Sequence, residues 1–193
     1  MSLEKTGAVL AAAGLSSRMK SFKPMLPFGG TTISRHRVSV IRAQGVDPIV
    51  VVTGYRGEEL EAHLSGCGVR FVRNERYRET QMFESVKLGI RSVIGECGRV
   101  LIMPMDLPAI QPETFQLVLR EECEAVRTSC RGMAGHPLMV SCALARRLCS
   151  YQGEGGLRGA IEHAHVLVAE VEVEDEGVFR DVDTRAEYLK LLA

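Results

Sequence analysis

A short segment between residues 12 and 23 combines small residues, hydroxyl groups and positive charges. The residues of these kinds are Ala12, Ala13, Gly14, Ser16, Ser17, Arg18 and Lys23. Small residues let the backbone approach a ligand closely, hydroxyls and amides donate hydrogen bonds, and two fixed cations attract anions. Taken alone, such a segment is also typical of an ordinary turn with solvated basic residues. The combination predicts a turn that binds a polyphosphate.

Asp106 is the next residue with a clear chemical interpretation. It follows the apolar run 100–103, and Pro108 stiffens the turn behind it. If that run is a strand of a parallel sheet, the carboxylate lies at the edge where such sheets bind ligands. Mg²⁺ prefers one or two carboxylates together with phosphate oxygens and water. Facing Arg18, Lys23 and a triphosphate, Asp106 is predicted to hold magnesium; the alternative is a surface aspartate that begins a turn.

Neither of the two common glycine motifs for phosphate is present. The pattern GxxxxGK followed by Ser or Thr is absent, and the spacing after Gly14 does not fit GxGxxG. The glycine-rich segment 153–159 follows a helix-like segment, whereas the dinucleotide fingerprint follows a strand. We interpret this segment as a loop that links two helices or borders the substrate site.

Composition excludes several classes of protein. The 193 residues are 46% hydrophobic and 25% charged, which predicts a single globular domain over 1–193. The 24 Lys and Arg residues balance 24 Asp and Glu residues, so the basic excess that duplex nucleic acid requires is missing. The apolar run 7–15 is too short to span a membrane. The six cysteines lack CxxC spacing, which favours reduced core thiols over disulfides or a zinc site. We therefore expect a cytoplasmic protein with neither nucleic-acid nor membrane partners.

Short apolar runs rich in β-branched residues alternate with segments of helical spacing. The expected strands cover 7–12, 48–53, 69–72, 99–103 and 165–173, and the expected helices cover 34–44, 58–64, 81–94, 112–123 and 141–150. This alternation implies parallel βαβ units. The alternating residues 171–174 predict a strand with one acidic, solvated face near the edge of the sheet. We predict an α/β fold, an open three-layer αβα architecture with a mainly parallel sheet, and chemistry in the turns that follow the strands.

Several ordered blocks resemble nucleotidyltransferases, in particular the molybdenum cofactor cytidylyltransferase group. The segment 10–19 followed by Lys23 is similar to the LAAGxSxRM signature and its later lysine. Further blocks follow in the family's order: Asn74 with 81–89, then 104–108, 135–137 and 181–184. The similarity spans roughly residues 7–188. It implies a Rossmann-like nucleotidyltransferase fold and Mg²⁺-dependent transfer of CMP from CTP to the phosphate of molybdopterin, with release of pyrophosphate.

The resemblance also implies roles for individual residues. The implied catalytic residues are Arg18, Lys23 and Asp106, and the implied nucleotide contacts include Asn74 and Ser85 besides the turn 12–23. The expected mechanism is one of positioning and charge neutralisation, because phosphoryl-type transfer needs little covalent chemistry from the protein.

Two residues of the later blocks are implied to contact the acceptor. His136 lies between Gly135 and Pro137, which we interpret as a rigid turn. Asp183 is implied to bind the acceptor and to join Asp106 at the metal. It stands at the start of an expected helix, where either an aspartate or Thr184 could provide the N-cap. Capping by Thr184 would leave Asp183 available for the metal.

Departures from the family pattern leave alternatives open. Lys20, Pro104-Met105 and Gln81 stand where the family usually has glycine. The alternatives are a guanylyltransferase that uses GTP on the same acceptor, a cytidylyltransferase for another phosphorylated small molecule, and a non-catalytic cofactor carrier. The form Ala12-Ala13-Gly14 resembles the cytidylyl group. The implied partners are CTP or another NTP, a molybdopterin-type acceptor, and a molybdoenzyme or its maturation chaperone that receives the product.

Overall fold

The computed structural model describes residues 5–14 and 21–192. The strands are β1 (Thr6–Ala11), β2 (Pro27–Phe28), β3 (Thr31–Thr32), β4 (Ile49–Thr53), β5 (Arg70–Arg73), β6 (Arg99–Pro104), β7 (Ala125–Cys130), β8 (Met133–Ser141) and β9 (Ala169–Glu172). The helices are η1 (Lys23–Met25), α1 (Ile33–Ala43), α2 (Gly57–His63), α3 (Met82–Val93), α4 (Pro112–Arg120), α5 (Cys142–Ser150), α6 (Gly156–His163), η2 (Glu176–Val178) and α7 (Arg185–Leu192).

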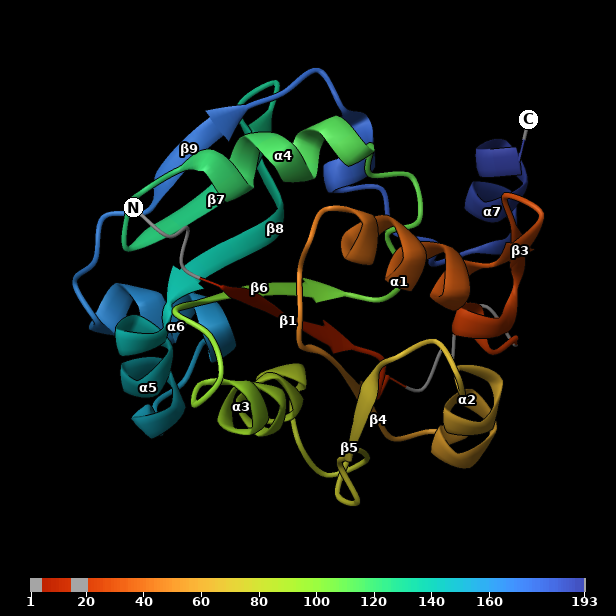
Figure 1. The fold of residues 1–193 in the computed structure, drawn as a ribbon, viewed down its shortest axis with the longest axis horizontal. Helices are drawn as coiled ribbons and strands as arrows, with labels where there is room; N and C mark the ends of the chain where they lie inside the picture. Colours follow the sequence, from red (N-terminus) through yellow and green to blue (C-terminus); the bar gives the residue numbers. More distant parts are fainter. Residues whose placement is uncertain (1–4, 15–20, 193) are drawn as a thin grey trace.

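A seven-stranded sheet in the order β5-β4-β1-β6-β8-β7-β9 forms the middle layer (Figure 1). Helices α1, α2 and α4 cover one face, and α3, α5 and α6 cover the other. Strand β8 is antiparallel to both of its neighbours, while β7 and β9 are parallel to each other. This arrangement confirms the predicted three-layer α/β fold with a mainly parallel sheet.

The parallel half of the sheet consists of β5, β4, β1 and β6, and each of its strands was expected within two residues of its observed bounds. Strands β1 and β4 are buried along their whole length. Their continuous apolar runs suit strands that are covered on both faces. Helix α3 packs directly on these strands, since a Cβ at Gly89 would lie 2.8 Å from Val52 Cγ2. This half thus forms a rigid base for the turns that follow it.

The antiparallel half contains the strands β7 and β8, which the sequence did not predict. Their hairpin turns at Arg131 and Gly132, with φ of 52° and 74°, the left-handed conformation of a tight two-residue turn. His136 lies inside β8, so its interpretation as part of a rigid turn is wrong. The expected helix 112–123 also ends early, because α4 stops at Arg120 before the chain enters β7.

The glycine-rich segment 153–159 is only partly a loop. Gly155 has φ of 83° and provides the N-cap of α6, which begins at Gly156. The interpretation of the whole segment as a loop was wrong because glycines have low intrinsic helix propensity, whereas packing of α6 against α3 and α5 stabilises the helix here.

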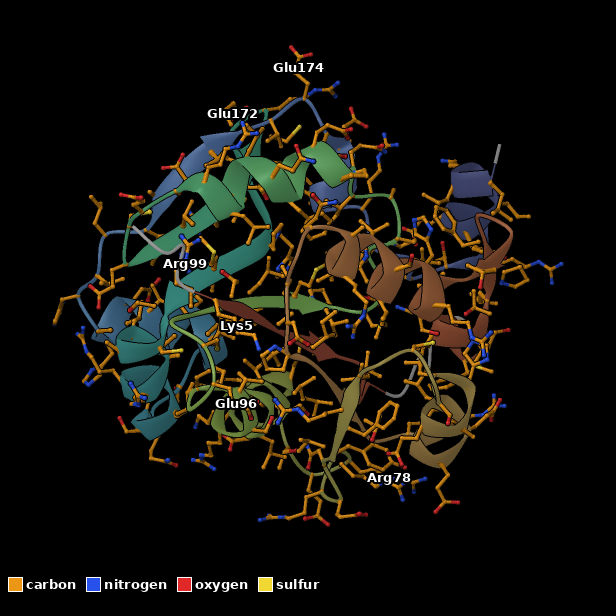
Figure 2. The ribbon with its side chains drawn as sticks, viewed as in Figure 1. Lys5, Arg78, Glu96, Arg99, Glu172 and Glu174 are labelled. Atoms are coloured by element: carbon orange, nitrogen blue, oxygen red, sulfur yellow. The ribbon has the colours of Figure 1, made fainter. Side chains whose placement is uncertain are left out.

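The outer edge of the sheet is acidic, as predicted. Strand β9 is the edge strand, with Glu170 and Glu172 exposed on one side. Glu172 and Glu174 lie at the periphery of the molecule (Figure 2). Among the described residues, no helix has the length and apolar character needed to cross a membrane.

Candidate active site

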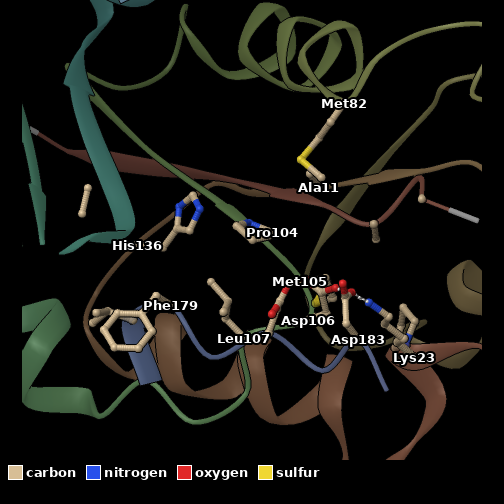
Figure 3. A pocket seen from close by; sticks show the side chains of 16 residues that line it. Ala11, Lys23, Met82, Pro104, Met105, Asp106, Leu107, His136, Phe179 and Asp183 are labelled. Atoms are coloured by element: carbon tan, nitrogen blue, oxygen red, sulfur yellow. Dashed lines mark hydrogen bonds and ion pairs between the residues drawn. The ribbon is translucent and has the colours of Figure 1, made fainter. Parts of the chain in front are cut away.

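A cavity of about 490 Å³, termed the central cavity, opens at the carboxyl ends of β1 and β6 (Figure 3). The register of these strands places Ala11 opposite Pro104. The Met105 amide then donates a 3.0 Å hydrogen bond to the Ala11 carbonyl, so the turns after the two strands lie side by side. Six residues singled out from the sequence line this cavity: Ala12, Gly14, Lys23, Asp106, His136 and Asp183.

Lys23 joins two carboxylates from distant parts of the chain. Its Nζ lies 2.9 Å from Asp106 Oδ2 and 2.5 Å from Asp183 Oδ1. The lysine side chain is 9% exposed, and the Asp106 and Asp183 side chains are 26% and 22% exposed. Burial opposes the charge of Lys23, but the hydrogen bonds and charges of Asp183 and Asp106 outweigh burial and raise the pKa of its ammonium. Lys23 therefore carries a fixed positive charge in the cavity.

The backbone around Asp183 explains how this residue reaches the site. The Val182 amide donates a 3.2 Å hydrogen bond to the Asp106 carbonyl. Just after it, the Glu187 carboxylate accepts from the Thr184 amide at 2.7 Å, and the Thr184 hydroxyl accepts from the Glu187 amide at 3.2 Å. This reciprocal pair is a capping box at the start of α7. Thr184 therefore provides the cap of α7, and the Asp183 carboxylate faces Lys23.

The carboxylate pair has the chemistry of a site for a divalent cation. Asp106 and Asp183 both reach the same ammonium, so their oxygens face a common point. Asp181 also lines the cavity, and burial together with the charges of Asp183 and Asp106 raises the pKa of its carboxyl group. Within the described ranges, no group of three or more His, Cys, Asp or Glu side chains is arranged to hold a metal. Two carboxylates with phosphate oxygens and water fit the preference of Mg²⁺, and these two are the candidate ligands.

A smaller cavity of about 100 Å³, termed the inner cavity, adjoins the central cavity at the start of α3. The two cavities share the lining residues Ala11, Gly14 and Met82. Ala13 and Ser85 line the inner cavity. The Ser85 hydroxyl accepts a 2.9 Å hydrogen bond from Asn74 Nδ2, and Asn74 is only 4% exposed. The structure thus brings Ser85 to the cavity and places Asn74 behind it as a support.

His136 lies on β8 at the end of the central cavity away from Lys23 (Figure 3). Its Nδ1 atom is buried and has no hydrogen-bond partner among the described residues. Burial lowers the pKa of the imidazole, against the opposing effects of the Asp106 charge and the Ile102 carbonyl. The ring is therefore neutral near pH 7 and can offer or accept a hydrogen bond.

Arg37 supports the Asp106 turn and was missed from the sequence. It is fully buried in α1, donates to the Leu107 carbonyl and stacks over the Phe115 ring at 5.4 Å. Burial lowers the pKa of its guanidinium to about 9, and the charge of Asp175 opposes this effect. The available signal was its spacing, because Ile33, Arg37 and Ile41 fall on one helix face that is otherwise apolar.

Three predicted contacts, Ser16, Ser17 and Arg18, lie outside the described residues. Asp181 was not singled out from the sequence, although it belongs to the same block as Asp183. Its spacing of two residues from Asp183 in an otherwise extended segment was the signal that could have identified it.

An open α/β sheet that presents a small-residue turn, a buried lysine and two carboxylates at its carboxyl edge defines the class as nucleotidyltransferases. The comparisons with known proteins agree with this class. Residues 7–169 match the family model of the MobA-like NTP transferase domain, and the chain belongs to this family.

Relatives of known name or structure cover nearly the whole chain. The chain is 29% identical over 188 residues to the molybdenum cofactor cytidylyltransferase of Escherichia coli strain K12, covering 94% of this chain and 92% of that one. A nucleotidyl transferase from Methanothermobacter thermautotroptrophicus superposes with a TM-score of 0.85 and 26% identity, covering 97% and 95% of the two chains. Rv0371c of Mycobacterium tuberculosis H37Rv, in a complex with manganese, has a TM-score of 0.79 and 24% identity over 98% of each chain. The last likeness shows the fold alone.

Proposed function

We propose that this protein transfers a CMP group from CTP to the phosphate of a molybdopterin-type acceptor and releases pyrophosphate. The observation that carries the proposal is the convergence of Lys23, Asp106 and Asp183 beside the turn that starts at Ala12. The 29% identity to a molybdenum cofactor cytidylyltransferase along the whole chain supports the acceptor and the base.

The reaction balances without a nucleophile from the protein. An oxygen of the acceptor phosphate attacks the α-phosphorus of CTP, a new P–O bond forms, and the bond from the α-phosphorus to the bridging oxygen breaks. Pyrophosphate leaves with the electron pair of that bond. The chain's task is to hold the two phosphates in line and to offset the negative charge that develops.

Lys23 and the turn at Gly14 are suited to the triphosphate. The Lys23 ammonium is buried and held at a known position by two carboxylates, so little reorganisation is needed when charge moves toward the leaving group. Gly14 is exposed at the mouth of both cavities, where its backbone can approach a phosphate closely.

Asp106 and Asp183 would hold the divalent cation. When bound, such a cation neutralises phosphate charge and polarises the reacting P–O bonds. A manganese complex of a structural neighbour supports a divalent cation, and the oxygen-only donor pair favours Mg²⁺ or Mn²⁺.

The inner cavity is the proposed site of the nucleobase. Its small volume and the Ser85 hydroxyl suit the edge of a pyrimidine ring rather than a purine. Asn74 holds the Ser85 hydroxyl in place, which fixes the direction of that hydrogen bond.

The test measures pyrophosphate released by the purified protein with Mg²⁺, molybdopterin and each of the four nucleoside triphosphates in turn. We expect release that depends on both the acceptor and CTP. Preference for GTP would instead establish a guanylyltransferase. Release with CTP and another phosphorylated acceptor, but not with molybdopterin, would establish a different cytidylyltransferase. Binding of the acceptor without release under any condition would establish a carrier.

A further inference from the structure

Two cysteine side chains meet where the loop between α3 and β6 packs against the start of α5. Cys97 lies in that loop, and Cys142 is the first residue of α5. Their Sγ atoms are 3.7 Å apart, and the Cys142 Sγ donates a 3.0 Å hydrogen bond to the Cys97 carbonyl. The two thiols are therefore in direct contact, although 45 positions separate them in the sequence.

Backbone hydrogen bonds hold the two segments that carry these cysteines. The Cys142 amide donates a 2.8 Å bond to the Gly98 carbonyl, and the Gly98 amide donates a 2.9 Å bond to the Lys5 carbonyl. These bonds continue the register in which Arg99 of β6 pairs with Ser141 of β8. The sheet therefore fixes the backbone on both sides of the thiol contact.

The surroundings of the two thiols accommodate a bond between them. Cys97 is half-buried and Cys142 is only 5% exposed, and both belong to the apolar cluster between the sheet and helices α3 and α5. Gly7 of β1 leaves the space for Cys97, because a Cβ at Gly7 would lie 3.0 Å from the Cys97 Sγ. A disulfide carries no charge, so the apolar cluster can hold it without burying an ion. Cys97 is the more accessible of the two to a small oxidant.

We propose that Cys97 and Cys142 form a modification site at which a hydroperoxide produces an intramolecular disulfide. The Cys97 thiolate attacks a peroxide oxygen, the O–O bond breaks, and Cys97 becomes a sulfenic acid. The Cys142 thiolate then attacks the Cys97 sulfur, the S–S bond forms, and the departing hydroxide takes up a proton. Overall, the thiols lose two electrons and two protons, and hydrogen peroxide becomes two molecules of water. Because an S–S bond is about 2.05 Å long, the sulfurs must approach from 3.7 Å by rotation about the two Cα–Cβ bonds.

The disulfide would close a long loop of the chain. The segment between the two cysteines contains β6, α4, β7 and β8. A bond that closes such a loop restricts the unfolded chain and thereby favours the folded state. Cys97 precedes β6 whereas Asp106 follows it, so the bond lies at the end of this strand away from the central cavity. Oxidation is therefore expected to stabilise the fold, independently of the proposed function.

The first test locates the bond by mass spectrometry. The folded protein is treated with hydrogen peroxide, alkylated, and digested with trypsin without a reductant. Trypsin places the two cysteines in the separate peptides 92–99 and 132–146, and each of these peptides contains a single cysteine. We expect a linked species with the mass of both peptides less two hydrogens. Cys97→Ser should abolish this species, whereas Cys123→Ser, a matched change at another half-buried cysteine, should retain it.

Two results of this experiment would overturn the proposal. One is an oxidised wild type without the linked species, including a protein in which Cys97 proceeds only to the sulfinic acid. The other is a wild type in which peptide 132–146 is joined to a cysteine other than Cys97.

The second test measures whether the bond is compatible with the folded chain. Thermal unfolding of the oxidised wild type is expected to show a midpoint about 5 °C or more above that of the reduced protein, and dithiothreitol should reverse the rise. Cys97→Ser treated in the same way should show no rise, and it also controls for oxidation of methionines by the peroxide. A midpoint of the oxidised wild type at or below that of the reduced protein would overturn the proposal, because the bond would then require the native packing to open.

Discussion

The two halves of the sheet deliver residues to the cavity in opposite ways. In the parallel half, the functional residues come directly after the strands, as Ala12 follows β1 and Asp106 follows β6. In the antiparallel half, His136 lies near the beginning of β8, because an antiparallel strand presents its first residues at the edge where its neighbour ends. A search for functional residues only in the turns after strands therefore finds those of the parallel half and misses His136.

The difference also separates the proposed tasks. The parallel half carries the turn, the lysine-bound aspartate and the inner cavity, which all concern the nucleotide. The antiparallel half carries His136, which lines the central cavity and is proposed to contact the acceptor. Changes in the first half should affect the chemical step, whereas changes in the second should affect acceptor binding or local stability.

The largest effect is expected for Asp106→Asn. Loss of this carboxylate would weaken the proposed cation site, so kcat should fall by about 10³-fold or more, while the unfolding transition is retained. Steady-state release of pyrophosphate at several Mg²⁺ concentrations measures the change. Asp47→Asn, which removes an exposed carboxylate paired with Lys5, is the control and should keep wild-type activity. Wild-type turnover by Asp106→Asn would remove Asp106 from the mechanism.

A smaller loss is expected for Lys23→Ala. The variant lacks the buried ammonium that is proposed to offset the charge of the leaving pyrophosphate, and kcat should fall by roughly 10²-fold. Single-turnover kinetics with saturating CTP would isolate the chemical step, and Lys190→Ala, an exposed lysine on α7, provides the control. A rate within about twofold of the wild type would make Lys23 a bystander.

In the antiparallel half, Gly135→Ala tests packing. A Cβ at this position would lie 2.7 Å from Val178 Cβ and 2.9 Å from Thr128 Oγ1, so the free energy of unfolding should drop by about 1–3 kcal/mol. Urea denaturation measures the change. Gly95→Ala, where a Cβ meets nothing within 4 Å, should leave the stability within about 0.5 kcal/mol of the wild type. A drop of the same size in both variants would show that packing against Val178 is not the cause.

The smallest effect is expected for the contribution of His136 to the loss of folding stability at acidic pH. Its pKa is lowered in the folded state by burial, so the unfolded chain binds the proton more readily and stability falls as pH decreases below the unfolded pKa of about 6.5. His136→Gln should therefore show a weaker loss of stability between pH 7 and acidic pH. Thermal unfolding across this range measures the slope, with His165→Gln at an exposed position as the control. An unchanged slope in His136→Gln would place the acid sensitivity elsewhere.

Sequence patterns predicted the parallel half because its strands are short apolar runs bounded by turns. The same reasoning failed for β7 and β8. Their turn at Arg131-Gly132 lacks the common Asn-Gly or Asp-Gly pair, and Pro137 argues against a strand by propensity. Pairing with β6 and β7 on the two sides decides the conformation of β8, and local sequence does not encode such long-range contacts.

The sequence identified the residues of the candidate site more fully than it identified their arrangement in space. Lys23, Asp106 and Asp183 were named from motifs, yet Lys23 and Asp183 stand 160 residues apart, and only the fold brings them within 2.5 Å. Arg37 was missed because a buried cation contradicts the usual preference of its helix face. Such contradictions of local rules concentrate where a fold serves a site.

The bridge from Lys23 to both aspartates makes the ammonium an internal counterion of the acid pair. A divalent ion held by the two carboxylates would compete with this ammonium, whereas a triphosphate in the cavity would offer the ammonium new anionic partners. Each ligand would thereby weaken the contact between Lys23 and the aspartates that opposes binding of the other ligand. The coupling free energy between the two binding events is the same in both directions. Nucleotide and divalent ion should accordingly each increase the affinity of the protein for the other.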